Sequence, residues 1–477
     1  MIAGLKSYPA MKDTGVPWLG HVPEHWEIRR IKYILRERDV RSLDGSEQLL
    51  RVSQYTGVTE RKRADGGEEP DTRAESLVGY KRVEPNDLVV NIMLAWNGSM
   101  GVSPFFGIAS PAYCVYYFRP GAQPWFFHHL LRSPAYKARI KAVSTGVVES
   151  RLRLYTDDLF RLEALVPPPA EQAAIVRFLD YADRRIRRYI RAKQKLIKLL
   201  EEQKQAIIHR AVTRGLDPNV RLKPSGVEWF GDVPEHWEVS QIRSVAHVVR
   251  GGSPRPAGSP LYFHGTCAPW ITVGEITKDS GMYLIETSTR LTPAGAERSR
   301  MIEVGTLLLT NSGATLGIPK ISHIQGCIND GVAAFLKLRA RVNKEFLYFY
   351  WLTQTAHLKA WVDLGAQPNL NTQIIGSWPV PIPTIDEQEV IVQYIRQETV
   401  LFTDATERAN CEISLLREYR TRLIADVVTG KRDVREAAKE LPEEAEELET
   451  LNEGEDLIDA GEEAADGLDT APEETEA

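Results

Sequence analysis

The chain has 477 residues, 43% hydrophobic and 26% charged, the composition of an ordinary soluble protein long enough for two or three domains. No apolar run approaches the roughly 20 residues that span a bilayer, and four cysteines without CxxC spacing predict reduced thiols in a cytoplasmic protein. The net charge of −6 combines +10 over residues 1–440 with sixteen carboxylates, and no Lys or Arg, in residues 441–477.

Two closely similar segments open two halves of the chain. Residues Thr14–Ile28 read TGVPWLGHVPEHWEI and residues Ser225–Val239 read SGVEWFGDVPEHWEV, with ten of fifteen positions identical. A second pair follows, VPPPAEQAAIVRFL from Val166 and PVPIPTIDEQEVIVQYI from Pro379. The VPEHWE runs lie 211 residues apart and the Glu-Gln pairs 216 apart, far beyond solenoid periods of roughly 20–50 residues. The pattern indicates a tandem duplication of one domain plus one helix.

Each duplicated domain is predicted to mix short strands with helices. Apolar runs at 87–94, 113–118 and 306–311 predict strands, and Gly, Pro and Asn residues between them predict loops. Residues 124–140 and 343–362 predict helices at matching places in the two copies. We therefore expect an α+β fold in which two tandem-duplicated α/β domains are separated by long coiled-coil-type helices in a pseudo-two-fold arrangement.

A long helix is predicted after each domain. Mostly apolar residues recur every 3.5 positions, the spacing of a coiled-coil seam. The seam positions are Ile175, Leu179, Ala182, Ile186, Tyr189, Lys193, Leu196, Leu200, Gln203 and Ile207, then Ile391, Ile395, Glu398, Phe402, Ala405, Ala409, Glu412, Leu416, Tyr419 and Leu423. Roughly forty residues at about 1.5 Å each give rods on the order of 60 Å, which we expect to pack on each other.

The predicted boundaries follow from these elements. They are a first domain at 1–165, a first helix at 166–216, a linker at 217–224, a second domain at 225–378, a second helix at 379–434 and an acidic tail at 435–477. The tail is expected to be disordered, because it has almost no large apolar residues. Two roles are open for the tail. It is either a solubility appendage or a polyanion mimic that folds over the basic body and competes there with a polyanionic partner.

The charge pattern suggests a polyanionic partner, since a basic body remains when the tail is set aside. The first helix also carries six arginines on its polar faces: Arg177, Arg184, Arg185, Arg187, Arg188 and Arg191. They form either a solvated helix surface or a contact with phosphates or an acidic partner.

No catalytic constellation is evident. The nearest match to a phosphate-binding GxxxxGK[ST] loop is Gly430-Lys431, with Ala425 in place of the first glycine and Arg432 in place of the hydroxyl residue. No GxGxxG run opens a helix, and the histidines lack HExxH or Cys/His ligand spacing. We therefore expect a protein that is not an enzyme and has no metal site.

The order of these motifs resembles that of the specificity subunit of type I restriction–modification enzymes. The two VPEHWE runs match that family's domain openings, and RGGSPRP (Arg250–Pro256) with APWITVGEI (Ala268–Ile276) resembles the loop and strand that follow. NIMLAWNGSMGV (Asn91–Val102) and LLLTNSGATLGI (Leu307–Ile318) resemble its mid-domain signature. QPNLNTQIIGSWPVPIP (Gln367–Pro383) resembles its passage from domain to helix.

The first copy departs from the family at its domain end, where residues Val147–Pro169 read VVESRLRLYTDDLFRLEALVPPP. Gln367 and Asn369 of the second copy therefore have no equivalent in the first. The resemblance extends over residues 14–434.

The resemblance implies a non-catalytic subunit with two target recognition domains, each reading one half of a bipartite, asymmetric site in double-stranded DNA. The helices would set the spacing between the halves and dock two methyltransferase subunits, with motor-nuclease restriction subunits joining for cleavage. S-adenosylmethionine, ATP and Mg would be held by those partners, and this subunit would need no cofactor.

Base edges are read by arginine at guanine and by asparagine or glutamine at adenine. The candidates are Gln54, Arg61, Lys62, Arg63, Asn97 and Arg151 in the first copy, and Arg250, Arg255, Asn311, Gln367, Asn369 and Asn371 in the second. For each one, a loop or turn role is the alternative. The paired Trp26, Trp237, His25 and His236 are expected to be structural.

A different class of protein is the alternative reading of the whole chain. A stand-alone, two-headed DNA-binding architectural or regulatory protein would use the same two domains but would need no partner surface on the helices.

Overall fold

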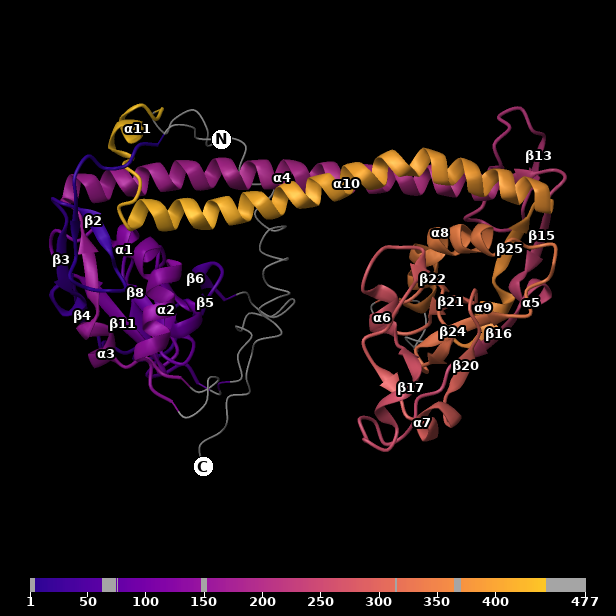
Figure 1. Cartoon of the computed structure of the whole chain (residues 1–477), viewed down its shortest axis with the longest axis horizontal. Coiled ribbons are helices and arrows are strands. Elements are labelled where there is room, and N and C mark those ends of the chain that lie inside the picture. The colour runs from indigo at the N-terminus through magenta and orange to yellow at the C-terminus, as the bar shows by residue number, and fades with distance from the viewer. Residues whose placement is uncertain are drawn as a thin grey trace. The chain divides into compact units, whose positions relative to one another are not determined.

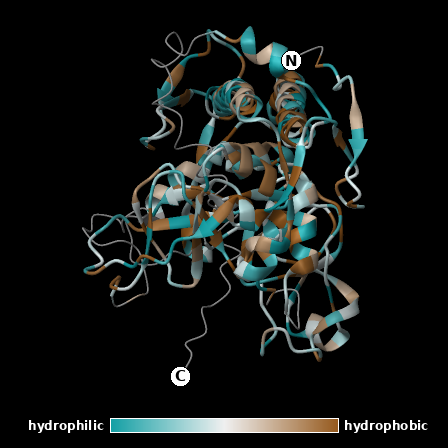
Figure 2. Cartoon of the chain, turned by 90° about the vertical axis from the view of Figure 1, so that its left-hand side faces the viewer, coloured by the Kyte–Doolittle hydropathy of each residue, from teal (hydrophilic) through white to brown (hydrophobic). Residues whose placement is uncertain are grey.

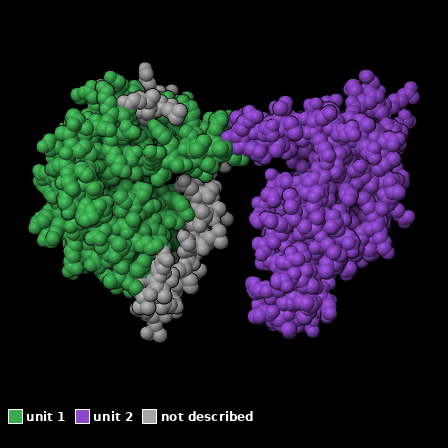
Figure 3. Space-filling model, viewed as in Figure 1, with its two compact units in different colours: residues 1–195, 410–477 green, residues 196–409 purple. Residues whose placement is uncertain are grey.

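The computed structural model describes residues 5–61, 74, 76–146, 152–313, 315–363 and 370–442. Two compact units are present, unit 1 with residues 1–195 and 410–477 and unit 2 with residues 196–409 (Figures 1 and 3). Each unit therefore combines one of the duplicated domains with part of both long helices. Within the described ranges, no helix is long and apolar enough to cross a membrane.

The domain of unit 1 is built from short antiparallel strands and short helices. The strands are β1 Met11–Asp13, β2 His21–Pro23, β3 Glu27–Arg30, β4 Leu35–Glu37, β5 Leu50–Ser53, β6 Gly57–Glu60, β7 Lys81–Val83, β8 Leu88–Asn91, β9 Met100–Val102, β10 Gly107–Ala109, β11 Tyr113–Phe118 and β12 Glu163–Val166. The helices are η1 Ile31–Tyr33, η2 Ala95–Asn97, α1 Pro124–Leu131, α2 Pro134–Val143 and α3 Thr156–Arg161. The largest sheet has the order β4-β11-β8-β9, and β3 pairs with β12 beside the start of the first long helix.

The domain of unit 2 repeats this plan with larger sheets. The strands are β13 Leu222–Pro224, β14 Asp232–Pro234, β15 Glu238–Gln241, β16 His247–Arg250, β17 Phe263–Ile271, β18 Tyr283–Leu284, β19 Arg290–Leu291, β20 Arg300–Ile302, β21 Leu307–Thr310, β22 Pro319–Ser322, β23 Gly326–Ile328, β24 Val332–Leu336 and β25 Pro379–Ile382. The helices are α5 Ile242–Val245, α6 Val273–Thr277, α7 Pro293–Glu297, α8 Lys344–Asp363 and α9 Thr372–Ser377. The sheets run β16-β24-β21-β22-β18 and β19-β17-β23-β20, and β15 pairs with β25 as β3 does with β12.

The predicted secondary structure is largely confirmed, with one instructive difference between the copies. The strand predicted at 113–118 is β11, and those at 87–94 and 306–311 contain β8 and β21. The helix predicted over 124–140 is divided into α1 and α2, because Pro134 has no amide hydrogen and holds Ser133 in an extended conformation. The second copy lacks that proline, and α8 is continuous.

The two long helices are α4, Pro169–Arg214, and α10, Ile385–Val428. In unit 1 they run antiparallel, since Asp183 binds Arg420 while Lys193 Nζ lies 2.7 Å from Glu412 Oε2. Burial alone would raise the pKa of Asp183, but Arg420 and Arg187 outweigh it and lower that pKa below its usual value. The helices are therefore joined by charge as well as by apolar contact.

Each domain core contains the end of the helix that belongs to the other copy. Leu423, Val427 and Val428 of α10 are buried in the core of unit 1. Ile208 and Val212 of α4 are buried in the core of unit 2, where Lys204 Nζ also donates to Thr403 Oγ1 at 2.9 Å. Figure 2 views both long helices nearly end-on and shows hydrophobic and hydrophilic residues on each of them.

The strict 3.5-residue seam holds at Ala409 and Leu423 but misses the buried face at Tyr189, Glu398 and Glu412. Tyr189 is 50% exposed and its neighbour Ile190 is 5% exposed, while Thr399 and Ile413 are buried one position after the predicted Glu398 and Glu412. A nearly straight helix rotates by about 20° per heptad relative to a 3.5-residue repeat, so its buried face moves to the next residue.

Two further boundaries differ from the sequence prediction. Residues Pro379–Ile382, assigned to the second helix, form β25, because three prolines lie between 379 and 383. The predicted tail begins with a short helix, α11 Arg435–Lys439, held by burial of Val434 and Ala438. Residues 443–477 lie outside the described ranges.

A buried hydrogen-bond cluster fixes the first domain to the start of α4. Trp26 is fully buried and its Nε1 donates to Glu171 Oε1 at 3.0 Å. The same carboxylate accepts from Tyr8 Oη at 2.6 Å and has His25 Nε2 at 2.6 Å. Gly430, at the end of α10, lies against the indole, where a Cβ would approach a ring atom of Trp26 to 3.3 Å. This cluster is called joint 1.

The second copy repeats the cluster as joint 2. Trp237 is 1% exposed and its Nε1 donates to Glu387 Oε1 at 3.0 Å. His236 Nε2 lies 3.0 Å from Glu387 Oε2, and Gly215, at the end of α4, lies against the indole. The structural roles predicted for the paired Trp and His residues are therefore confirmed.

The glutamines that follow the two glutamates also connect each domain to its long helix. Gln172 Nε2 donates to Pro167 O at 2.7 Å and its Oε1 accepts from Gln123 N at 2.8 Å. Gln388 makes the same pair of bonds, to Pro383 O at 2.9 Å and from Asn343 N at 2.8 Å. The Glu-Gln motif is thus a structural connection between domain and helix.

The two joints differ in burial, and this difference predicts unequal stability losses. The Glu171 side chain is 5% exposed and that of Glu387 is 28% exposed. Leaving a buried donor unpaired costs roughly 1–3 kcal/mol. We expect Glu171→Ala to lower the free energy of unfolding by about 3 kcal/mol and Glu387→Ala by about 1 kcal/mol. Urea denaturation followed by tryptophan fluorescence measures both, with the exposed Glu202→Ala as control, and equal losses would contradict the assignment.

Candidate nucleic-acid interface

In unit 1 one arginine organises the loops that carry two candidate base readers. Arg132, at the carboxyl end of α1, donates to the backbone carbonyls of Ser53–Tyr55, including Gln54 O at 2.9 Å. It also donates to the carbonyls of Gly98 and Met100. A guanidinium has five N–H donors in a rigid plane, which suits it to hold several carbonyls at once. The β5–β6 turn and the segment after η2 are thereby held together.

Asn97 lies directly before that second anchored segment. Its Oδ1 accepts from Ser99 N at 3.0 Å and Ser99 Oγ at 2.8 Å, so the side-chain oxygen closes a local turn. Beneath the turn, His128 Nδ1 accepts from Val102 N at 3.1 Å. Burial, together with the charge of Arg132, keeps the pKa of His128 well below its usual value, so the imidazole stays neutral and can accept that bond. Gln54 and Asn97 are thus brought to neighbouring loops.

The other candidates of the first copy are not gathered at this place. Arg61 follows β6, and its amide donates to Leu49 O at 2.9 Å, which puts it at the opposite end of the β5–β6 hairpin from Gln54. Lys62, Arg63 and Arg151 lie outside the described residues. Their contacts with DNA stay predictions.

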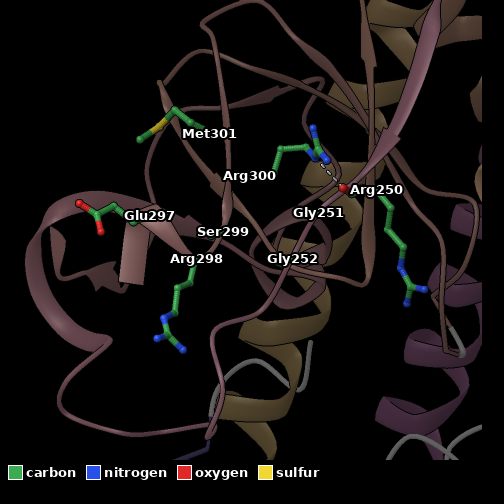
Figure 4. Close-up of a pocket in the computed structure, with 8 residues that line it drawn as sticks. All are labelled: Arg250, Gly251, Gly252, Glu297, Arg298, Ser299, Arg300 and Met301. Carbon is green, nitrogen blue, oxygen red and sulfur yellow. Dashed lines mark hydrogen bonds between the residues drawn. The ribbon is translucent and has the colours of Figure 1, made fainter. Parts of the chain in front are cut away.

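In unit 2 the candidate Arg250 lines a hollow that is rich in arginine. This hollow of about 470 Å³ is lined by Arg250, Gly251, Gly252, Glu297, Arg298, Ser299, Arg300 and Met301. Figure 4 shows the guanidinium groups of Arg250 and Arg298 extending from two different segments, the end of β16 and the loop after α7. Arg300 Nε donates to Arg250 O at 2.8 Å and so joins the two segments.

The loop that follows Arg250 has a fixed shape. Gly251 leaves no room for a side chain, because a Cβ there would lie 2.1 Å from a backbone oxygen. Asp330 contacts three residues of this loop. Its backbone carbonyl accepts a hydrogen bond from Arg250 Nε at 2.6 Å. Its carboxylate accepts a hydrogen bond from Ser253 Oγ at 2.5 Å and lies 3.6 Å from Arg255 Nη2. The Arg255 side chain is 73% exposed. Its cation is therefore presented at the surface.

Of the remaining candidates of the second copy, Asn311 and Asn371 have structural positions. Asn311 is only 1% exposed, which does not favour a direct base contact in this conformation. Asn371 Oδ1 accepts from Ile374 N at 2.8 Å and caps the start of α9. Gln367 and Asn369 lie outside the described residues. None of these placements tests whether the residues read bases.

Sequence reasoning missed Arg132, Arg298 and Arg300. Arg132 lay inside a predicted helix and was not considered as a loop anchor, although Pro134 two residues later marks a helix end. Arg298 and Arg300 belong to no motif, and only their alternation across Ser299 distinguishes them in the sequence.

The chemistry of the hollow favours an anion. Three of its lining residues are arginines, and Glu297 is the single carboxylate among them. Arginine binds phosphate and guanine edges through paired N–H groups. Across the described part of the chain, no group of His, Cys, Asp and Glu side chains is arranged to hold a metal ion.

Comparison with known proteins finds one matching family model and relatives that are similar over most of the chain. Residues 234–413 match the family model of the type I restriction modification DNA specificity domain. Over 451 residues the chain is 22% identical to the putative type I restriction enzyme MjaX specificity subunit of Methanocaldococcus jannaschii, covering 87% of this chain and 96% of that one. The MjaVIII specificity subunit of the same organism is 20% identical over 439 residues, covering 87% and 94%.

A solved structure shares the fold. A chain from a study of complex assembly and conformational transition of the type I R-M system aligns with a TM-score of 0.61 and 17% identity, covering 85% of this chain and 98% of that chain. The chain is thus similar over most of its length to specificity subunits of type I restriction enzymes, and residues 234–413 match the DNA specificity domain of that family.

The role given to Arg132 can be tested by hydrogen exchange. Arg132→Lys replaces the planar guanidinium by an ammonium, whose three donors lie on one nitrogen and cannot reach all five carbonyls. We expect exchange of the amides near residues 53–55 and 98–100 to become about tenfold faster, the factor that corresponds to roughly 1.4 kcal/mol of lost local stability. Mass-spectrometric deuterium uptake measures it, with the exposed Arg119→Lys as control. Unchanged uptake in both segments would show that other contacts hold the loops.

Proposed function

We propose that this chain is the DNA-reading subunit of a type I restriction–modification complex, with each domain reading one half of a bipartite asymmetric site. The observation that carries this proposal is the duplicated joint, with Trp26 on Glu171 and Trp237 on Glu387. The same scaffold is used twice, while the loops on it differ in sequence. Loops on a fixed scaffold carry variable binding chemistry, so the two halves of the site should differ in sequence.

The proposed DNA contacts lie on the loops already described. In unit 1 they are the β5–β6 turn with Gln54 and the neighbouring turn with Asn97, both held by Arg132. In unit 2 they are Arg250, Arg255 and the hollow that Arg298 lines. Phosphate contacts position a protein on the duplex and base contacts give specificity, and these arginines can supply both.

The helices are proposed to set the spacing between half-sites and to dock partners. Two methyltransferase subunits would bind the two related surfaces, and motor-nuclease subunits would join for cleavage. We propose that this subunit is not catalytic, and that S-adenosylmethionine, ATP and Mg are bound by the partners. The stand-alone architectural protein stays the alternative.

Exchange of one domain tests the proposal. Because β15 pairs with β25 and joint 2 lies outside them, residues 242–378 can be replaced by those of a relative without cutting the joint. Co-expression with the methyltransferase subunits, followed by single-molecule methylation mapping, should give a site changed only in one half. The unaltered chain is the control. Changes in both halves would contradict independent reading, and methylation that does not need this chain would favour the alternative.

The hollow in unit 2 makes a separate prediction about salt dependence. If Arg298 neutralises one phosphate, Arg298→Ala should reduce the slope of log affinity against log salt concentration by about 0.9. The sequence preference should stay unchanged, because phosphates carry no base information. Binding isotherms at several salt concentrations measure it, with the exposed Arg243→Ala as control. An unchanged slope, or a changed preference, would exclude the phosphate role.

A further inference from the structure

The outer face of α4 in unit 1 carries a continuous row of cations. Arg177, Arg184, Arg188, Arg191 and Lys195 follow one another at spacings of seven, four, three and four residues, which place them on one side of a helix with 3.6 residues per turn. All are exposed except Arg191, which is half-buried. This set is called the basic stripe. It lies opposite the buried seam, whose members include Ile175, Leu179, Ala182 and Ile186.

The charge of this part of α4 is poorly balanced within the helix. Between Arg177 and Lys198 the sequence has nine Lys or Arg residues and two carboxylates, Asp180 and Asp183. Asp183 is turned to the helix interface, where it binds Arg187 and Arg420. Like charges four residues apart destabilise a helix, as at Arg191 and Lys195, so a bound polyanion would stabilise this segment.

The two residues that precede the acidic segment, Leu441 and Pro442, contact Arg177, the first residue of the stripe. Leu441 packs against the core of unit 1, next to the buried Val434 and Ala438. Arg177 Nη2 then donates to Leu441 O at 2.9 Å and to Pro442 O at 3.4 Å. The next residue, Glu443, opens a segment that holds sixteen carboxylates and no Lys or Arg.

We propose that residues 443–477 bind along the basic stripe of α4. The stripe is roughly 27 Å long, at about 1.5 Å per residue. The thirty-five residues from 443 to 477 can extend to about 115 Å at roughly 3.3 Å per residue, so they reach all of it. Tethering at Leu441 gives these carboxylates a high effective concentration at the stripe, which an untethered polyanion lacks.

This inference does not depend on the proposed function, since it concerns two segments of one chain. Its consequence is that the segment occupies a surface which would otherwise attract DNA phosphates or acidic protein surfaces. Any such partner has to displace it. The occupied surface is the stripe on α4, which is distinct from the domain loops.

Zero-length carbodiimide cross-linking of the full chain tests the proposal, because it joins a carboxylate to a lysine only in direct contact. At 0.1 M salt we expect residues 443–477 to link to Lys195 and its neighbour Lys198 in preference to lysines of the domains. At 1 M salt the yield should fall about tenfold, because the screening length shortens from about 10 Å to about 3 Å. A mixture of labelled and unlabelled chains should show that the links are intramolecular.

A matched pair of charge reversals provides the control. Arg184→Glu with Arg188→Glu should abolish the links to Lys195, whereas Arg210→Glu with Arg408→Glu changes the net charge equally, at exposed helix positions off the stripe, and should leave them intact. Circular dichroism checks that each variant is folded. Links spread evenly over the chain, links concentrated on the domain loops, links between different chains, or equal effects of the two pairs would overturn the proposal. The salt comparison on the unaltered chain is decisive even if a variant fails to fold.

Discussion

The hydrogen bond from a buried indole to a glutamate in the first turn of a long helix is the contact on which the rest of the molecule depends. A carboxylate is favoured there by the partial positive charge of the helix start, and burial makes each of its hydrogen bonds costly to lose. In both copies the indole also contacts a glycine at the end of the opposite helix, Gly430 or Gly215. One tryptophan therefore fixes a domain to both helices at once.

The two joints are completed by different routes. In unit 2 the chain passes directly from the end of α4 through Gly215 to β13. In unit 1 the segment after α10 and the segment before β1 are not consecutive in the chain, and hydrogen bonds connect them instead. Asp433 N donates to Lys6 O at 2.8 Å, and Arg432 Nη1 donates to Leu5 O at 3.2 Å. Tyr8 adds its hydroxyl to Glu171, a contact that accompanies the deeper burial of joint 1. Hydrogen bonds thus connect the helix end to the domain in unit 1, whereas the continuous backbone makes this connection in unit 2.

Sequence was a good guide wherever one copy could be compared with the other. The duplication, the two long helices and the structural role of Trp26 and Trp237 all followed from repeated residues. The seam failed at Tyr189, because a 3.5-residue template cannot follow a helix whose period is closer to 3.6. The domain loops differ between copies, so comparison could not select their contacts. The sequence prediction therefore included Asn311, which is buried. It did not include Arg132, because the five backbone carbonyls that Arg132 binds come from segments far away in the sequence.

The exchange of helix ends between the copies also constrains how the protein can be made. The core of unit 1 needs Val427 and Val428, which leave the ribosome long after the first domain's own residues. Until then that domain has an uncovered apolar surface beside Trp26. The core of unit 2 takes Ile208 and Val212 from residues already synthesised, so all of its parts are present earlier. The order of synthesis therefore favours completion of the second domain before the first.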